Sequence, residues 1–191
     1  MEDFPESDLV LKAQQGDVDA FTRLAEHYQA KIYHMIMRMT RDHCDTADLL
    51  QETFLRAFRS LPRFKRNSSF YTWLYRIAVN RTLNFLKKTR TESTRRRDRV
   101  FPLTSDGLGS RTVFQPEKRM LNSELKNHLD RAIESLPAVY RAAFMLVEFE
   151  GLSHKQAAFA LKCSEKTVSW RMHRARKRLQ ARLGSFIEGG R

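Results

Sequence analysis

The residues best suited to chemistry lie near the end of the chain, where cationic side chains follow one another closely. Residues 153–183 hold nine basic residues and one acidic residue. Lysine and arginine at this density bind phosphate groups, and an arginine can also grip guanine through two hydrogen bonds. The alternative is a charged helix face that serves only solubility. The apolar positions within the same stretch favour a folded reader of nucleic acid.

These apolar positions predict two short helices separated by a tight turn. Ser153 and Ser164 are suitable N-caps, and only Lys162 and Cys163 stand between the two helices. This pattern is typical of a helix-turn-helix, whose second helix enters the major groove of DNA. The core between the helices would consist of Ala158, Leu161, Val168 and Met172.

Lys162 occupies the turn position where glycine is common. A left-handed lysine costs about 1 kcal/mol, which a folded domain tolerates. Side chains directed away from the small core are the candidates for contacts with duplex DNA, and Arg171 and Arg176 flank them. These candidates are Lys166, Ser169, Trp170, Arg171, His173, Arg174, Arg176 and Lys177.

A second polar group lies on the predicted helix 70–88 and on the loop before it. Amides and cations at four-residue spacing make one stripe, and the loop carries an aromatic residue among cations. Such a surface suits phosphates and unpaired bases. An ordinary solvated stripe fits the residues equally well. The candidates are Phe64, Lys65, Arg66, Thr72, Arg76, Asn80 and Asn84.

A third group lies on the predicted helix 45–61, where Asp48, Gln51, Glu52 and Thr53 stand beside apolar Leu49 and Phe54. From periodicity alone, we interpret this group as a solvated face above a core stripe. That stripe would consist of Ala47, Leu50, Phe54, Ala57, Phe58 and Leu61. Asp45 would open the helix, and Ser7 would cap an earlier short helix.

The elements that position these groups are helices throughout, because apolar residues recur at helical spacing and strand patterns are almost absent. The sequence predicts an all-α protein with two small helical domains, residues 1–90 and 117–186. Between them, residues 91–116 have no sustained period and contain an arginine cluster, which predicts a flexible basic linker.

The charge is divided unevenly along the chain. Of its 35 basic and 22 acidic residues, residues 1–60 carry 7 and 11, so the rest of the chain has a balance of +17. A polyanion is the expected partner of that basic part. The start lacks a signal-peptide pattern, no apolar run is long enough to cross a bilayer, and two cysteines cannot form a disulfide framework. We expect a cytoplasmic protein.

No catalytic constellation, metal-ligand spacing or phosphate-binding glycine loop is readable. We therefore expect a protein that is not an enzyme and that has no cofactor and no metal. His27 and His34 share one helix face, but no further ligand completes a set.

Residues 45–88 resemble region 2 of the bacterial sigma-70 family, in particular its compact extracytoplasmic-function (ECF) factors. The stretch "LPAVYRAAFMLVEFEGLSHKQAAFALKCSEKTVSWRMHRARKRL" resembles region 4 of the same family. Lys162 and Lys166 depart from the glycines that are frequent in that family. The matching region 2 residues are Asp48, Leu49, Gln51, Glu52, Phe54, Phe70, Thr72, Trp73, Leu74, Ile77, Ala78 and Asn80.

The resemblance implies a sigma factor that binds core RNA polymerase through the clamp coiled-coil and the flap, and that is held inactive by an anti-sigma factor. It implies that helix 70–88 and its loop capture the melted strand of a −10 element, and that the helix-turn-helix reads a −35 element in duplex promoter DNA. The residues implied in contact with core polymerase are Asp48, Leu49, Gln51, Glu52 and Leu55.

Two other functions stay open. A stand-alone helix-turn-helix regulator would bind an operator without polymerase and would use the first domain as dimeriser or sensor. A basic RNA-binding or nucleic-acid-modifying protein is the weaker alternative. Tight operator binding by the purified chain would favour the regulator, and preference for RNA over promoter duplex would favour the RNA-binding protein.

Overall fold

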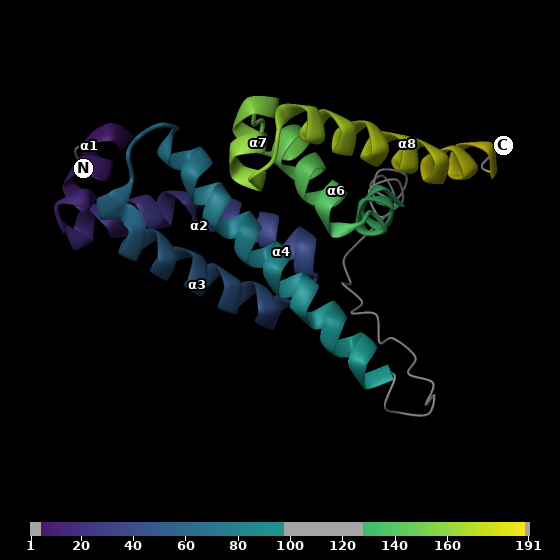
Figure 1. The fold of residues 1–191 in the computed structure, drawn as a ribbon, viewed down its shortest axis with the longest axis horizontal. Coiled ribbons are helices and arrows are strands. Elements are labelled where there is room, and N and C mark those ends of the chain that lie inside the picture. Colours follow the sequence, from purple (N-terminus) through teal and green to yellow (C-terminus); the bar gives the residue numbers. More distant parts are fainter. Residues whose placement is uncertain (1–4, 98–127, 190–191) are drawn as a thin grey trace, which may run out of the picture.

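A computed structural model of the chain describes residues 5–97 and 128–189, and within these ranges it contains helices and no strand. This agrees with the predicted all-α class. Figure 1 shows the first part of the chain as a group of helices at the left and centre, with α7 and α8 at the upper right. The elements of this part are α1 (Glu6–Gln14), α2 (Val18–Thr40), α3 (His43–Ser60), the 3₁₀ turn η1 (Leu61–Arg63) and α4 (Phe70–Arg97).

The first described residues of the second part, 128–134, are helical. Its π-helical turn η2 continues α6 directly, and Gly151 follows with a left-handed φ of 65°. Glycine is the residue that adopts this conformation without strain. The elements of this part are α6 (Ala138–Phe144), η2 (Met145–Phe149), α7 (His154–Leu161) and α8 (Glu165–Gly189).

Aspartates cap two helices of the first part. The Asp17 carboxylate accepts a hydrogen bond from the Ala20 amide at 2.9 Å, and that of Asp42 accepts one from the Asp45 amide at 2.8 Å. The predicted start of α3 at Asp45 is therefore wrong, because Asp42 caps it three residues earlier. Ser7 is not a cap either, since α1 begins at Glu6 after Pro5.

The core of the first part surrounds α2, whose Ile32, Met35 and Ile36 are fully buried. On α3 the predicted stripe is partly wrong. Ala47 and Phe58 are exposed, whereas Thr46, Leu49 and Thr53 are buried. Each buried threonine hydroxyl donates to a carbonyl one turn earlier, for example from Thr53 to Leu49 at 2.7 Å. This local bond lets a polar side chain enter the core without an unpaired group.

The predicted helix-turn-helix is confirmed. Ser153 and Gln156 form a capping box at the start of α7, and the Ser164 hydroxyl accepts a hydrogen bond from the Thr167 amide at 3.1 Å. Lys162 has the left-handed conformation expected at the turn, with φ 51° and ψ 47°. The predicted core residues Ala158, Leu161, Val168 and Met172 are all buried.

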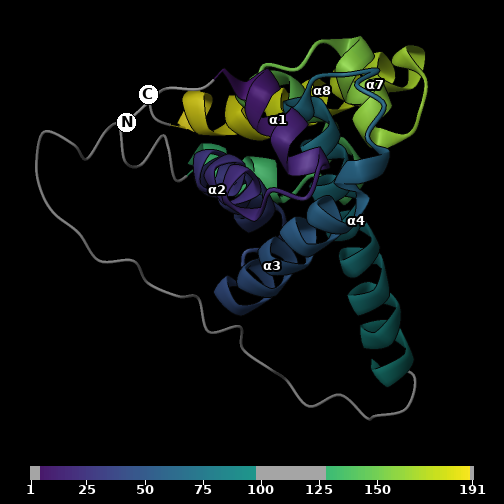
Figure 2. The same ribbon diagram turned by 90° about the vertical axis from the view of Figure 1, so that its left-hand side faces the viewer.

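The two parts pack against each other, so that one cluster of buried apolar residues spans both. α7 lies on α4, and α6 approaches α2 and α4, as Figures 1 and 2 show. The Arg141 guanidinium donates from α6 to the carbonyls of Arg38 and Met39 at 3.4 and 3.2 Å. These carbonyls end α2, where a cation is favoured, although burial lowers the pKa of Arg141.

The predicted linker is only partly described. Its first residues, 91–97, continue α4, and residues 98–116 lie outside the described ranges, together with the start of the predicted second domain up to residue 127. Nothing else in the described residues tests the predicted domain limits.

We predict that Lys162→Gly stabilises the protein by roughly 0.5–1 kcal/mol, because glycine removes the left-handed strain while it adds some entropy to the unfolded chain. Equilibrium unfolding in urea measures the change. Lys162→Ala is the matched control: it also removes the ammonium group but keeps the Cβ atom, so it should bring no gain. Equal gains in both variants would show that the charge, and not the backbone, is responsible.

Candidate nucleic-acid interface

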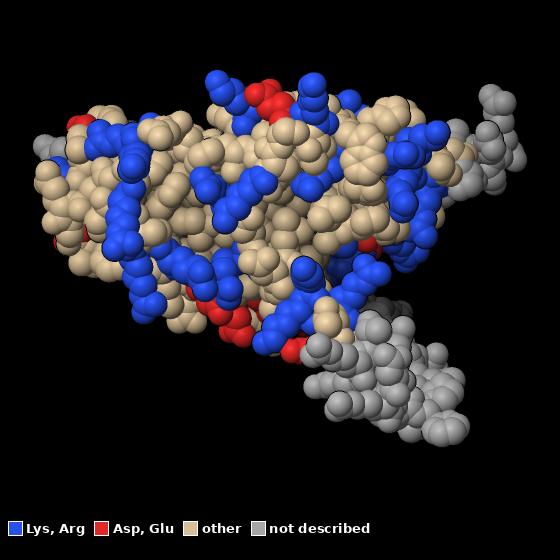
Figure 3. Space-filling view, viewed as in Figure 1, with Lys and Arg blue, Asp and Glu red and all other residues tan. Residues whose placement is uncertain are grey.

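The outer face of α8 carries the residues predicted to read duplex DNA. All of them except Arg171 are exposed, and Figure 3 shows Lys and Arg side chains spread over the face of the molecule that includes α8. Arg171 is half-buried, and its guanidinium lies 3.7 Å from the Cys163 sulfur. Arg176 forms an ion pair with Glu148 at 2.6 Å, which ties α8 to η2. The exposed members are Lys166, Ser169, Trp170, His173, Arg174, Arg176 and Lys177.

Trp170 is an apolar group at the centre of this cationic face, and 50% of its surface is exposed. Its ring meets that of Tyr140 edge-on, with 5.6 Å between centroids, and the Arg174 guanidinium lies 5.5 Å from its centre. Tyr140 thus holds the indole in place against α6. An exposed aromatic ring can contact a thymine methyl group, and an arginine beside it can contact a phosphate.

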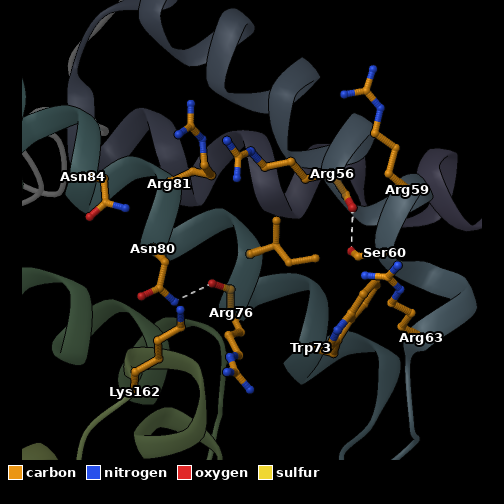
Figure 4. Close-up of a pocket in the computed structure, with 11 residues that line it drawn as sticks. Arg56, Arg59, Ser60, Arg63, Trp73, Arg76, Asn80, Arg81, Asn84 and Lys162 are labelled. Carbon is orange, nitrogen blue, oxygen red and sulfur yellow. Dashed lines mark hydrogen bonds between the residues drawn. The ribbon is translucent and has the colours of Figure 1, made fainter.

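A cationic pocket of about 710 Å³ lies between α3, α4 and the end of α7. Figure 4 shows arginine side chains around it, with Lys162 entering from the second part. The predicted residues Arg76, Asn80 and Asn84 line it together. The other lining residues are Arg56, Arg59, Ser60, Arg63, Trp73, Ile77, Arg81 and Lys162.

The arginines that α3 and η1 contribute to this pocket were not among the predicted site residues. Arg56, Arg59 and Arg63 are spaced by three and four residues, so they lie on one helical face. That spacing was the available signal. It could not show that this face turns toward α4.

A smaller pocket of about 180 Å³ lies under the loop before α4, and its lining includes Phe64 and Lys65 of the predicted −10 set. Phe64 is itself buried and packs on Trp73, with 4.9 Å between the ring centroids. Its ring therefore forms one wall of the pocket. The Ser68 hydroxyl, also in the lining, is buried and has no hydrogen-bond partner among the described residues. A planar polar group in this pocket could supply that partner.

Two members of the predicted −10 set do not reach these pockets. Thr72 is fully buried, and its hydroxyl pairs with that of Ser69 at 2.9 Å, so its predicted place on the outer stripe is wrong. Arg66 has a left-handed φ of 54°, and its guanidinium donates to the Gln14 side chain at 3.1 Å. The Gln14 amide in turn donates to the carbonyls of Leu61 and Phe64, which fixes the loop.

The residues predicted to contact polymerase lie on α3, and most are accessible. Asp48, Gln51, Glu52 and Leu55 are exposed, whereas Leu49 is only 3% exposed and belongs to the core. Its predicted contact therefore does not fit this structure. Glu52 forms an ion pair with Arg81 of α4, so this surface borders the cationic pocket.

Two tyrosines of α4 contact the second part of the chain. The hydroxyls of Tyr71 and Tyr75 both donate to the Glu150 carboxylate, and Tyr71 also donates to the Glu150 carbonyl at 2.9 Å. Burial, followed by the negative charge of Glu150, raises the pKa of Tyr71 to about 12, although the Tyr75 hydroxyl partly opposes the increase. Burial likewise raises the pKa of Tyr75. Both tyrosines therefore stay neutral donors at physiological pH.

No three histidine, cysteine or carboxylate side chains of residues 5–97 and 128–189 lie together as a metal site would require. Over the same ranges, no helix combines the length and the apolar character needed to span a membrane.

Comparison with known proteins assigns both parts. Residues 24–92 match the model of sigma-70 region 2, and residues 126–179 match that of sigma-70 region 4. The RNA polymerase sigma-H factor of Pseudomonas aeruginosa is 36% identical over 183 residues, which cover 94% of each chain. The ECF RNA polymerase sigma-E factor of Haemophilus influenzae is 38% identical over 181 residues, 92% of this chain and 93% of that one.

Solved structures share the fold. The sigma factor RpoE of Bartonella quintana, in complex with the anti-sigma factor NepR, superposes with a TM-score of 0.65 at 24% identity, over 87% of this chain and 98% of that chain. CnrH in complex with the cytosolic domain of CnrY superposes with a TM-score of 0.64 at 24% identity, over 93% of this chain and 96% of that chain.

We predict that Gln14→Ala destabilises the protein by about 1–3 kcal/mol, because two loop carbonyls and Arg66 lose their partner. Urea unfolding measures the loss, and hydrogen exchange at the Phe64 amide should report a more mobile loop. Gln15→Ala, at the exposed neighbouring position, is the control and should change neither measurement. A stable variant with an unchanged loop would mean that Gln14 does not fix the loop.

Proposed function

The chain belongs to the sigma-70 family, and since its relatives are ECF sigma factors we propose that it directs core RNA polymerase to promoters by reading a −35 and a −10 element. The single observation that carries this proposal is that two separate cationic surfaces lie on one chain. One is the exposed recognition helix α8, and the other is the cationic pocket beside α4. The protein recruits an enzyme and needs no catalytic residues of its own.

The −35 element is read in duplex form by α8. Lys166, Trp170 and Arg174 project from a helix that is firmly seated on α7 and α6, as an element entering a major groove must be. Arg176, held by Glu148 of η2, is exposed on the same helix and supplies a phosphate contact.

The −10 element is captured as a single strand by the loop and the outer side of α4. The arginines of the larger pocket hold phosphates, and Arg76, Asn80 and Asn84 meet the bases. The smaller pocket has the character of a site for one unpaired base, with aromatic walls, Lys65 at its rim and the unpartnered Ser68 hydroxyl. Binding of extruded bases favours strand opening without hydrolysis.

Core polymerase docks on α3 through Asp48, Gln51, Glu52 and Leu55, and its flap meets the second part of the chain. An exposed leucine among polar residues supports this assignment, because 47% of the Leu55 surface is left open beside the likewise exposed Phe58. An anti-sigma factor would cover such surfaces. The protein would act in the cytoplasm, where the polymerase is.

The main rival is a regulator that binds an operator without polymerase. The helix-turn-helix is compatible with it, but the rival gives no role to the pocket on α4. Dependence on polymerase separates the two: a sigma factor creates specific start sites only with core enzyme, whereas a regulator binds tightly alone.

We predict that run-off transcription with bacterial core polymerase on a promoter library yields specific starts only when this protein is added. Arg174→Ala should lower initiation about 5-fold to 100-fold, because one good base contact contributes roughly 1–3 kcal/mol. Arg23→Ala removes the same charge from an exposed position of α2 and should have little effect. Specific starts that do not require the protein, or equal losses in both variants, would contradict the assignment.

We predict that Leu55→Asp abolishes or strongly weakens capture of core polymerase in a pull-down, because a buried charge would replace an apolar contact. Val18→Asp places the same charge at another exposed apolar position and should leave capture unchanged. Normal binding by Leu55→Asp would exclude this part of α3 from the interface.

A further inference from the structure

The outer side of α4, which we propose to hold the −10 strand, is already in contact with α7 of the same chain. The Asn80 side-chain amide donates to the Ala160 carbonyl at 2.7 Å, and to the Arg76 carbonyl at 2.6 Å. The Arg76 guanidinium lies over the Phe159 ring at 4.4 Å from its centre. Two of the three pocket residues predicted to meet bases are therefore engaged with the second part.

The contacts made by Phe159 resemble those of an unpaired base. An aromatic ring stacks on an arginine and closes the pocket whose other walls are Phe64 and Trp73. A base held by a single-strand reader makes the same kinds of contact, with aromatic and guanidinium planes. Phe159 and a base cannot use the Arg76 face at the same time.

Other contacts between the two parts hold α7 in this position. Tyr71 and Tyr75 of α4 donate to Glu150, which lies just after η2. Arg41 forms an ion pair with Glu134, and the Arg38 guanidinium lies 4.4 Å from the centre of the Phe149 ring. The hydrogen bonds and the ion pair can be exchanged for water when the parts separate, whereas separation also exposes apolar residues of the cluster that spans both parts.

The remaining interaction surfaces stay open in this arrangement. The outer residues of α8 are exposed, and so are Asp48, Gln51 and Leu55 of α3. The packing of the two parts therefore occupies part of one of the three surfaces assigned above, at Arg76 and Asn80, and leaves the other two accessible.

We propose that α7 is an internal ligand of the −10 surface, with Phe159 and the Ala160 carbonyl in the place of an unpaired base, so that the closed chain cannot hold the melted strand until its two parts separate. This inference rests on the proposed −10 role of α4. The closed chain still binds a −35 duplex and still presents α3 to polymerase. Engagement of the strand reports that the chain has opened.

The test uses the full chain and two variants of the second part. Phe159→Ser removes the ring from the contact, and Phe159 is only half-buried and is not among the residues that make the core between α7 and α8. Val139→Ser removes an exposed apolar side chain from α6 of the same part and is the control. Small-angle X-ray scattering measures compactness, and fluorescence anisotropy measures binding to a labelled oligodeoxythymidylate.

We expect Phe159→Ser to enlarge the radius of gyration and to bind the single strand about tenfold more tightly, since apparent affinity falls with the fraction of closed chain. Binding of a labelled duplex should be unchanged, and Val139→Ser should behave as the parent chain. A compact Phe159→Ser variant, or an expanded one that binds the single strand no better, would overturn the proposal.

A further substitution separates this inference from the −10 assignment. Adding Arg76→Ala to Phe159→Ser should remove the gain in single-strand affinity while the chain stays expanded. If the gain survives, the strand binds elsewhere, and the −10 role of α4 fails together with the idea that α7 competes for it. If Phe159→Ser leaves shape and affinity unchanged while polymerase-dependent starts persist, only the internal ligand is refuted.

Discussion

The structure depends on α4, because opposite sides of this one helix must satisfy different requirements. Leu74, Tyr75, Ala78 and Val79 are fully buried and hold the helix against the rest of the chain. Arg76, Asn80 and Asn84 lie on another side, in a pocket lined by cations. A helix fixed by a dense core has little freedom to adjust, so the polar side chains start from defined positions. The same rigidity makes the surface a good partner for α7.

The cationic pocket shows how the charge of the chain is used. Arginines of α3, η1 and α4 converge on it. Glu52 forms an ion pair with one of them, Arg81. Like charges gathered in one pocket repel one another, so the arrangement costs free energy until a polyanion binds. Contacts of Arg76 and Asn80 with α7 add hydrogen bonding and stacking but no negative charge. They occupy the groups that we propose to meet bases and leave uncompensated the arginines that we propose to bind phosphates.

Much of the fold followed from the sequence, because it rests on local signals. Ser153, Ser164 and Lys162 defined the helix-turn-helix through capping and turn chemistry, and the structure confirms it. Two errors occurred where a threonine carried its own hydrogen bond into the core, as Thr53 and Thr72 do, so that a polar residue looked like a surface residue. The contact of Asn80 with Ala160 spans 80 residues. No local pattern encodes it, although a phenylalanine among the alanines of α7 was a hint of an apolar partner.

The closed arrangement also limits how far promoter DNA can shift the free chain toward the open state. A ligand shifts an equilibrium only by the difference in its affinity for the two states. A −35 duplex that meets an equally exposed α8 in both states supplies no such difference, so by itself it cannot open the chain. A melted strand binds only the open state and does supply it, but it exists only once polymerase has the promoter in place. On this proposal, opening is linked to assembly on the polymerase, and the purified chain has little means of engaging single strands alone.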